Sequence, residues 1–324
     1  MSHGGRRSAA DTSKVQSAAA EAGEFAVLYE AARIHVQAGR YLDAQLCCEQ
    51  ALALNAENPE TLHLAGIACF YSGQYDRSVE WISRALRREP KSVYLADLGA
   101  ALAKQGRIEE AVKAADKAVQ LTPDHADLWR NLGNVLIDAG RGSDALLCFQ
   151  HALKLDPRQW EAAYKAGQLL YDLGRFEEAL SHLESSLEQR PDSAPTLHMR
   201  ALVLKSLNRL DEALADGRRA IELDPTNADS YGNLAKVLEA LGRNEEALSW
   251  HDRSLAIAPN VMRIVTDRAI SLAALGRFDE AMKEYERALV IDPGQAPATW
   301  NLSQLQMLTG NFEAGWQGRE ARWR

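Results

Sequence analysis

Long apolar runs, cysteines and clustered histidines are scarce in this sequence, and each shortage removes a class of protein. No run of about 18 apolar residues occurs, so no membrane-spanning helix is expected. The four cysteines include no Cys-x-x-Cys pair and lack the even distribution of a disulfide framework. The eight histidines show no metal-ligand spacing on one helical face. We therefore predict neither a metal nor any other cofactor.

Positive charge is also in deficit. The chain has 37 Lys and Arg against 45 Asp and Glu, a formal net charge of −8. Because nucleic-acid binding rests on neutralising phosphates, this balance argues against a nucleic-acid partner. The N-terminal "MSHGGRRSAADTSKVQSAAAEAG" has an Arg pair but no apolar stretch after it, so no secretory signal is expected. We expect a cytoplasmic protein in which residues 1–24 form a flexible arm.

Catalytic arrangements are missing as well. No Ser/His/Asp or Cys/His combination can be singled out from the sequence. Acidic pairs such as Glu109–Glu110 could suggest acid–base chemistry. They are consecutive residues in the first turn of a helix, however, where the helix dipole favours negative charge. We predict that the chain is not an enzyme, unless a catalytic domain follows Arg324.

The sequence does contain a short turn-like segment that is repeated nine times. The copies are GRYLDAQ at 39, GQYDRSV at 73, GRIEEAV at 106, GRGSDAL at 140, GRFEEAL at 174, NRLDEAL at 208, GRNEEAL at 242, GRFDEAM at 276 and GNFEAGW at 310. Each step is 34 residues, except one of 33. A fixed period in this range is typical of a solenoid, in which each unit buries its apolar face against its neighbours.

The unit at 126–159 shows how one period folds. Trp129, Leu132, Gly133 and Leu136 share one face of a first helix, while Ala145, Phe149 and Ala152 share one face of a second. The small residues at Gly133 and Ala145 allow the two helices to approach closely. An Asp-Pro pair ends the second helix, because proline disfavours helical geometry in the residue before it. The same pattern recurs along the chain.

This pattern of Trp, Leu, Gly, Ala, Phe and Pro at fixed places resembles the tetratricopeptide repeat. The resemblance covers residues 25–324 and implies an all-α solenoid, a right-handed superhelix of about nine helix-turn-helix units. Departures are modest, such as Asn208 in place of the turn glycine and Gly315 in place of a small Ala. The repeats start near residues 25, 59, 92, 126, 160, 194, 228, 262 and 296.

The resemblance also implies that the first helices line a concave groove and that positions including the sixth and ninth of each repeat face a partner. An Asn amide there can pair with both the N–H and the C=O of an extended peptide, and nearby lysines would favour acidic side chains. Asn is a poor helix former, so its recurrence favours binding, although the polarity of any solvated helix face remains the alternative. We expect Asn131, Asn233 and Asn301 to face solvent in the free protein. The candidate peptide-binding residues are Asn131, Asn134, Lys165, Gln168, Asn233, Lys236 and Asn301.

These features favour a non-catalytic scaffold that binds a peptide or partner protein in its groove, and two alternatives stay open. The stretch "NLSQLQMLTGNFEAGWQGREARWR" is similar to the segment that precedes glycosyltransferase-like domains in some bacterial proteins. The array would then be the substrate-recruiting arm of a larger enzyme. In the other alternative, copies stack end to end as a homo-oligomer, because Phe312, Trp316 and Trp323 leave large apolar side chains at the C-terminal end.

Overall fold

The computed structural model describes the backbone of residues 9–294 and 296–320, and the side chains of residues 20–294 and 296–319. Within these residues all regular structure is α-helical, which confirms the predicted all-α solenoid of helical repeats. The chain divides into two units, Met1–Pro157 and Arg158–Arg324. The first unit contains α1 (Ala9–Gln37), α2 (Tyr41–Leu54), α3 (Pro59–Tyr71), α4 (Tyr75–Arg88), α5 (Ser92–Lys104), α6 (Ile108–Leu121), α7 (Ala126–Asp138) and α8 (Gly142–Leu155).

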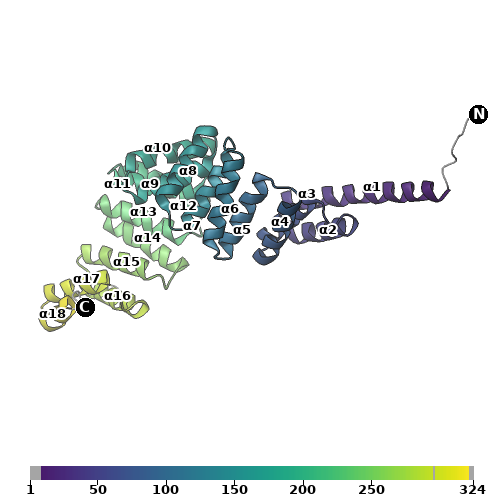
Figure 1. Ribbon diagram of the computed structural model, residues 1–324. Helices are drawn as coiled ribbons and strands as arrows, with labels where there is room; N and C mark the ends of the chain where they lie inside the picture. Colours follow the sequence, from purple (N-terminus) through teal and green to yellow (C-terminus); the bar gives the residue numbers. More distant parts are fainter. Residues whose placement is uncertain (1–8, 295, 321–324) are drawn as a thin grey trace, which may run out of the picture. The chain divides into compact units, whose positions relative to one another are not determined.

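The second unit has the same construction, and in both units each odd-numbered helix packs along the even-numbered helix that follows it (Figure 1). From α3 on, the odd-numbered helices begin at the residues from which the sequence counts its repeats. The helices of the second unit are α9 (Trp160–Asp172), α10 (Phe176–Gln189), α11 (Ala194–Ser206), α12 (Leu210–Leu223), α13 (Ala228–Ala240), α14 (Asn244–Ile257), α15 (Met262–Ala274), α16 (Phe278–Ile291), α17 (Ala296–Leu308) and α18 (Phe312–Glu320).

Part of the predicted N-terminal arm is helical, because α1 begins at Ala9 and runs without a break into the first repeat. Residues 1–8 lie outside the described residues. The flexibility of the arm stays a prediction.

The turn between the two helices of each repeat depends on one residue in the left-handed region. Eight of these residues are glycines with φ between 70° and 89°. In the sixth repeat Asn208 occupies the same place with φ of 59°. Asn tolerates this conformation better than most side chains, so the substitution noted in the sequence keeps the turn.

Close helix approach explains the small residues of the repeat. A Cβ atom added to Gly133 would lie 2.8 Å from the Phe149 ring, and one added to Gly167 would lie 2.7 Å from Leu183. Ala145 and Phe149 are themselves fully buried. At these two positions the facing helices therefore leave no space for a larger residue.

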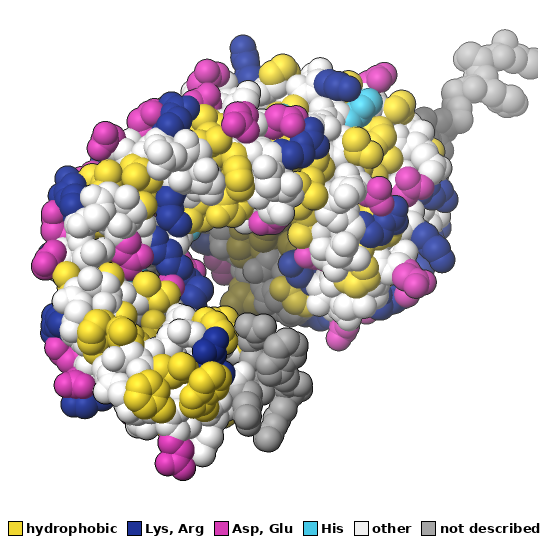
Figure 2. Space-filling model, turned by 90° about the vertical axis from the view of Figure 1, so that its left-hand side faces the viewer, with side chains coloured by type: hydrophobic (Ala, Val, Ile, Leu, Met, Phe, Trp, Pro, Cys, Tyr) yellow, Lys and Arg dark blue, Asp and Glu magenta, His cyan; other side chains and the backbone are white. Residues whose placement is uncertain are grey.

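The acidic residues at the start of the second helices have a structural role. Arg107 binds Glu110 at 2.7 Å and Arg175 binds Glu178 at 2.6 Å, and Arg243 and Glu246 form the same pair. The hydrogen bond from each arginine lowers the pKa of its glutamate. Figure 2 shows acidic and basic side chains interspersed over one face of the molecule. Each of these carboxylates pairs with the arginine of the turn that precedes its helix.

Candidate functional site

The first-helix face of α7 carries two unpaired amides. Asn131 and Asn134 lie one turn apart and both are half-buried. Neither side chain hydrogen-bonds to another residue in the part of the chain that the structure describes. Each amide therefore keeps a donor and an acceptor available for a ligand. The next charged pair on this helix, Arg130 with Asp127, is joined at 3.1 Å.

On α9, in the second unit, the corresponding positions carry a cation and an amide. The Lys165 ammonium donates to Gln168 Oε1 at 3.4 Å and lies 5.6 Å from the centre of the Tyr164 ring. No carboxylate pairs with Lys165 among the described residues. The half-buried α9 face therefore presents a positive charge that its own unit does not neutralise.

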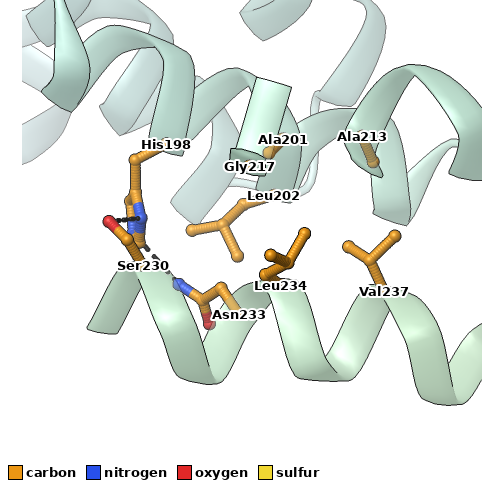
Figure 3. A pocket seen from close by; sticks show the side chains of 9 residues that line it. All are labelled: His198, Ala201, Leu202, Ala213, Gly217, Ser230, Asn233, Leu234 and Val237. Atoms are coloured by element: carbon orange, nitrogen blue, oxygen red, sulfur yellow. Dashed lines mark hydrogen bonds between the residues drawn. The ribbon is translucent and has the colours of Figure 1, made fainter. Parts of the chain in front are cut away.

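A three-residue hydrogen-bond group joins α11 to α13 (Figure 3). His198 Nδ1 lies 3.0 Å from Ser230 Oγ, and Asn233 Nδ2 lies 3.0 Å from His198 Nε2. Because an amide N–H₂ can only donate, Nε2 is the acceptor and the ring proton sits on Nδ1. Burial lowers the pKa of His198, and Arg263 lowers it further against the opposing effect of Asp229. The neutral ring is the form that this geometry requires.

Behind this group lies a small cavity lined mainly by Leu202, Leu234 and Val237, which Figure 3 shows beside the imidazole. Its volume of about 10 Å³ is at the lower limit for a single water molecule. It is therefore a packing gap between α11, α12 and α13 and holds no organic ligand.

Charged residues of α13 and α15 neutralise one another. Lys236 Nζ lies 2.7 Å from Asp267 Oδ2, and an Arg263 nitrogen lies 3.5 Å from the same oxygen. Arg263 also pairs with Asp229. The Asp267 side chain is only 10% exposed, so the pair is shielded from much of the solvent. Lys236 thus stabilises the junction between two repeats.

A second polar group lies deeper between the same helices. His251, which is fully buried, has Nε2 at 3.0 Å from Glu239 Oε1, and the Ser271 hydroxyl donates to the same oxygen. Burial acts to raise the pKa of Glu239, but the bonds from His251 and Ser271 outweigh it and the pKa is lowered. Glu239 is therefore held as a carboxylate acceptor in the packing of α13, α14 and α15.

Asn301 on α17 lies close to Tyr285 of α16, a residue that is 2% exposed. Burial raises the pKa of Tyr285 to about 12, and the neighbouring Asn301 amide acts in the opposite direction.

The structure places all seven candidate residues on first-helix faces, but it divides them into two groups. Asn233 and Lys236 have partners in the neighbouring helices, and Asn301 lies against Tyr285. All seven candidates are half-buried, including Asn131, Asn233 and Asn301, which were expected to face solvent. A role in peptide binding stays a prediction for each of them.

Sequence reasoning also missed the polar contacts that join successive repeats. His63 Nε2 lies 2.6 Å from Asp97 Oδ2, 34 residues further along the chain, and His198 and Asn233 are 35 residues apart. The eight histidines show no metal-ligand spacing, yet His63 and His198 occupy the same repeat position. A search for complementary side chains about one period apart would have found these pairs.

No group of three or more His, Cys, Asp or Glu side chains among residues that the structure describes could hold a metal ion. No helix in the same residues combines the length and the apolar character needed to cross a bilayer.

Comparison with known protein families gives four matches. Three family models described as tetratricopeptide repeat match residues 35–102, 130–194 and 226–294. A fourth, described as TPR repeat, matches residues 99–140 and 201–242. Together they account for most of the chain from residue 35 to residue 294.

Similar individual proteins share this repeat architecture. Residues of the chain are 38% identical over 78 positions to Superkiller protein 3 of Saccharomyces cerevisiae, a match to 24% of this chain and 5% of that protein. The Cut9–Hcn1 hetero-tetramer of the APC/C matches with a TM-score of 0.64 and 18% identity, over 82% of this chain and 52% of that chain. A tetratricopeptide repeat protein from Parabacteroides merdae matches with a TM-score of 0.58 and 20% identity, over 77% and 98%.

The chain thus spans a twentieth of the yeast protein and about half of the Cut9–Hcn1 chain. At identities of 18% and 20%, the two structures show a common fold and nothing further. The family matches, the 34-residue period and the stacked helix pairs agree, and the chain belongs to the tetratricopeptide repeat family.

Proposed function

We propose that this chain is a scaffold that grips the backbone of an extended peptide through the α7 face. Tetratricopeptide repeats generally serve as scaffolds for protein or peptide partners, and the chain shares their fold. The observation that carries the proposal is the pair Asn131 and Asn134, two half-buried amides without a partner in the described residues. Two such amides on one face leave two donor–acceptor pairs available to a peptide backbone, and this supports the proposal.

The spacing of the two amides suits an extended chain. Asn131 and Asn134 are three residues apart on the helix, so they are separated by about 4.5 Å along the axis. Alternate residues of an extended peptide are about 6.6 Å apart and direct their N–H and C=O groups to the same side. The flexibility of the Asn side chain covers the difference. Asn131 and Asn134 can therefore bind two alternate residues of a peptide, each amide pairing with the N–H and the C=O of one residue.

The α9 face adds a charge preference within the second unit. Lys165 has no carboxylate partner there, whereas Lys236 is neutralised by Asp267. A carboxylate of the ligand would supply the missing partner for Lys165 at little desolvation cost, because this side chain is only half-buried. We infer that the second unit, taken by itself, recognises an acidic ligand through Lys165.

A random peptide library displayed on phage supplies the probe, and the selected peptide is titrated by fluorescence anisotropy. Loss of two backbone-directed bonds in Asn131→Ala with Asn134→Ala should weaken binding by about 2 kcal/mol, roughly thirtyfold. Lys165→Gln should reduce the advantage of acidic over neutral peptides and leave neutral peptides unaffected.

Matched controls are Asn55→Ala, at the exposed C-terminal end of α2, and Lys117→Gln, on the exposed side of α6. Both should retain wild-type affinity. Equal affinity of the double Asn variant and the wild type, with unchanged circular dichroism, would show that the α7 face is merely solvated.

A second candidate is the recruiting arm of a larger bacterial glycosyltransferase-like enzyme. It rests on the sequence of residues 301–324 alone, of which 321–324 lie outside the described residues. The reading frame beyond Arg324 tests it directly: a continuing transferase-like domain supports the arm, and a stop codon rejects it.

A further inference from the structure

Within each unit, every repeat after the first packs its first helix against the preceding repeat. This contact buries two fixed positions of that helix. The third and the tenth residue of these helices are at most 8% exposed. In the first unit these residues are Thr61, Tyr94, Leu128, Ala68, Ala101 and Val135. In the second unit they are Thr196, Ser230, Ile264, Ala298, Val203, Val237, Ser271 and Leu305.

The first repeat breaks this rule. Its third and tenth residues are Val27 and Ile34, which are 69% and 50% exposed. Both are apolar, as a junction position requires, and both lie on the repeat portion of α1. No helix among the described residues covers this side of α1. The N-terminal repeat thus presents the surface of an internal junction without the preceding repeat.

The C-terminal repeat presents the other half of such a junction. The twenty-first position of the repeat, on the second helix, is buried or half-buried at every internal junction within a unit. Gln45, Leu180 and Leu248 are at most 8% exposed, and the half-buried residues are Val79, Val112, Leu214 and Met282. At the same position on α18, Trp316 is 56% exposed, and Phe312 one turn earlier is 60% exposed. These two side chains lie where the first helix of a following repeat would pack.

Internal junctions show how the two halves meet. The Gln45 side chain, at the twenty-first position, donates to the carbonyl of Ala68, at the tenth position of the next repeat. Tyr94, at a third position, belongs to the same buried cluster as Ile82 and Ala85 of the preceding second helix. Trp316 and Ile34 hold the same two positions as Gln45 and Ala68, but on the opposite ends of the chain.

We propose that copies of this chain associate head to tail, with α18 of one copy packed against α1 of the next as successive repeats pack within the chain. The occupant is a second copy because the chain itself contains this junction many times, and each of its ends carries one half of it. Trp316 would cover Ile34, and Phe312 would lie beside it. The contact is heterologous, so each copy keeps one free end and association continues with concentration. It is independent of the peptide face on α7.

Light scattering coupled to size exclusion, at rising protein concentration, tests the proposal. The wild type should exceed the monomer mass of 35.7 kDa. Ile34→Glu and Trp316→Glu should each remain monomeric alone, because each lacks one half of the junction. Mixed together they should form one-to-one dimers, since one variant has an intact C-terminal end and the other an intact N-terminal end.

Val290→Glu, at an 83% exposed residue of α16 that is neither Ile34 nor Trp316 nor an equivalent repeat position, is the matched control and should associate as the wild type does. Phe312→Glu provides a second C-terminal variant if Trp316→Glu loses its helical circular dichroism. A wild type that stays monomeric throughout, or an Ile34→Glu variant that still associates alone, would overturn head-to-tail association. Either result would leave the α7 peptide proposal untouched.

Discussion

Helices α7 and α13 carry Asn at the same repeat position, but only the Asn of α13 is hydrogen-bonded to another side chain among the described residues. Asn131 on α7 and Asn233 on α13 hold the same repeat position, and both are half-buried. Asn131 has no side-chain partner in the described residues, whereas Asn233 is bonded to His198 of the preceding repeat. One turn further, Asn134 is unpaired and Lys236 is joined to Asp267.

The difference teaches that a repeat position decides where a side chain lies, while the neighbouring repeat decides whether it is available. Histidine at the fifth position of one repeat meets the sixth position of the next, as His198 meets Asn233 and His63 meets Asp97. In the repeat before α7 that fifth position is Ala96, which cannot form a hydrogen bond through its side chain. Asn131 therefore stays unpaired.

The largest expected effect on stability comes from a substitution that disrupts the packing of α8 against α7. Ala145 is fully buried in α8, so Ala145→Arg would bury a charge between two helices. We expect a loss of about 4 kcal/mol or more in the free energy of unfolding of the first unit. Thermal unfolding followed by circular dichroism measures it. Leu147→Arg, two residues further and 65% exposed, is the control, and an unchanged midpoint for Ala145→Arg would contradict the packing described.

A smaller effect is expected from the paired amide of α13. Asn233→Ala leaves the half-buried His198 Nε2 without its donor, so we expect the free energy of unfolding to fall by about 1–2 kcal/mol. Urea denaturation at neutral pH measures the change. The variant Asn233→Gln keeps the amide on a longer stem and should recover part of the loss. No loss in Asn233→Ala would mean that the bond to His198 contributes nothing to folding.

Much of the fold could be predicted from the sequence because its determinants are local and periodic. The 34-residue step is read directly from the sequence, and the close helix approach at Gly133 and Ala145 follows from elementary sterics. The faces of the candidate residues followed equally well. Their partners did not, because Lys236 and Asp267 are 31 positions apart on different helices and pair only once the repeats stack. The exposed Val27 and Ile34 were missed for the same reason: only the buried equivalents in later repeats show that they lack a cover.

Acidification should weaken the polar group that contains Asn233 on α13, because it includes His198. The pKa of His198 is lowered in the folded state by burial, so the unfolded chain binds the proton more readily. Its contribution to stability is complete above the unfolded pKa of about 6.5 and is lost as the pH falls through the folded pKa. His182, whose pKa burial also lowers, contributes in the same direction. Urea titrations from pH 7 to 5, roughly spanning that range, should show a shallower pH dependence for His198→Gln than for the wild type. Identical slopes would show that His198 is not the titrating group.

The smallest expected effect on folding comes from the unpaired amides of α7, and it distinguishes the two faces most directly. Asn131 and Asn134 have no intramolecular partner to lose, so Ala at both positions removes no bond from the fold. Ala is also the better helix former by up to about 0.7 kcal/mol at each position. The double variant should therefore unfold at the same urea concentration as the wild type or a slightly higher one, in contrast to Asn233→Ala. If it were destabilised as much as Asn233→Ala, the α7 amides would already be engaged within the fold. The same asparagine at the same repeat position would then serve one structural purpose in both units, and the case for a peptide on α7 would lose its support.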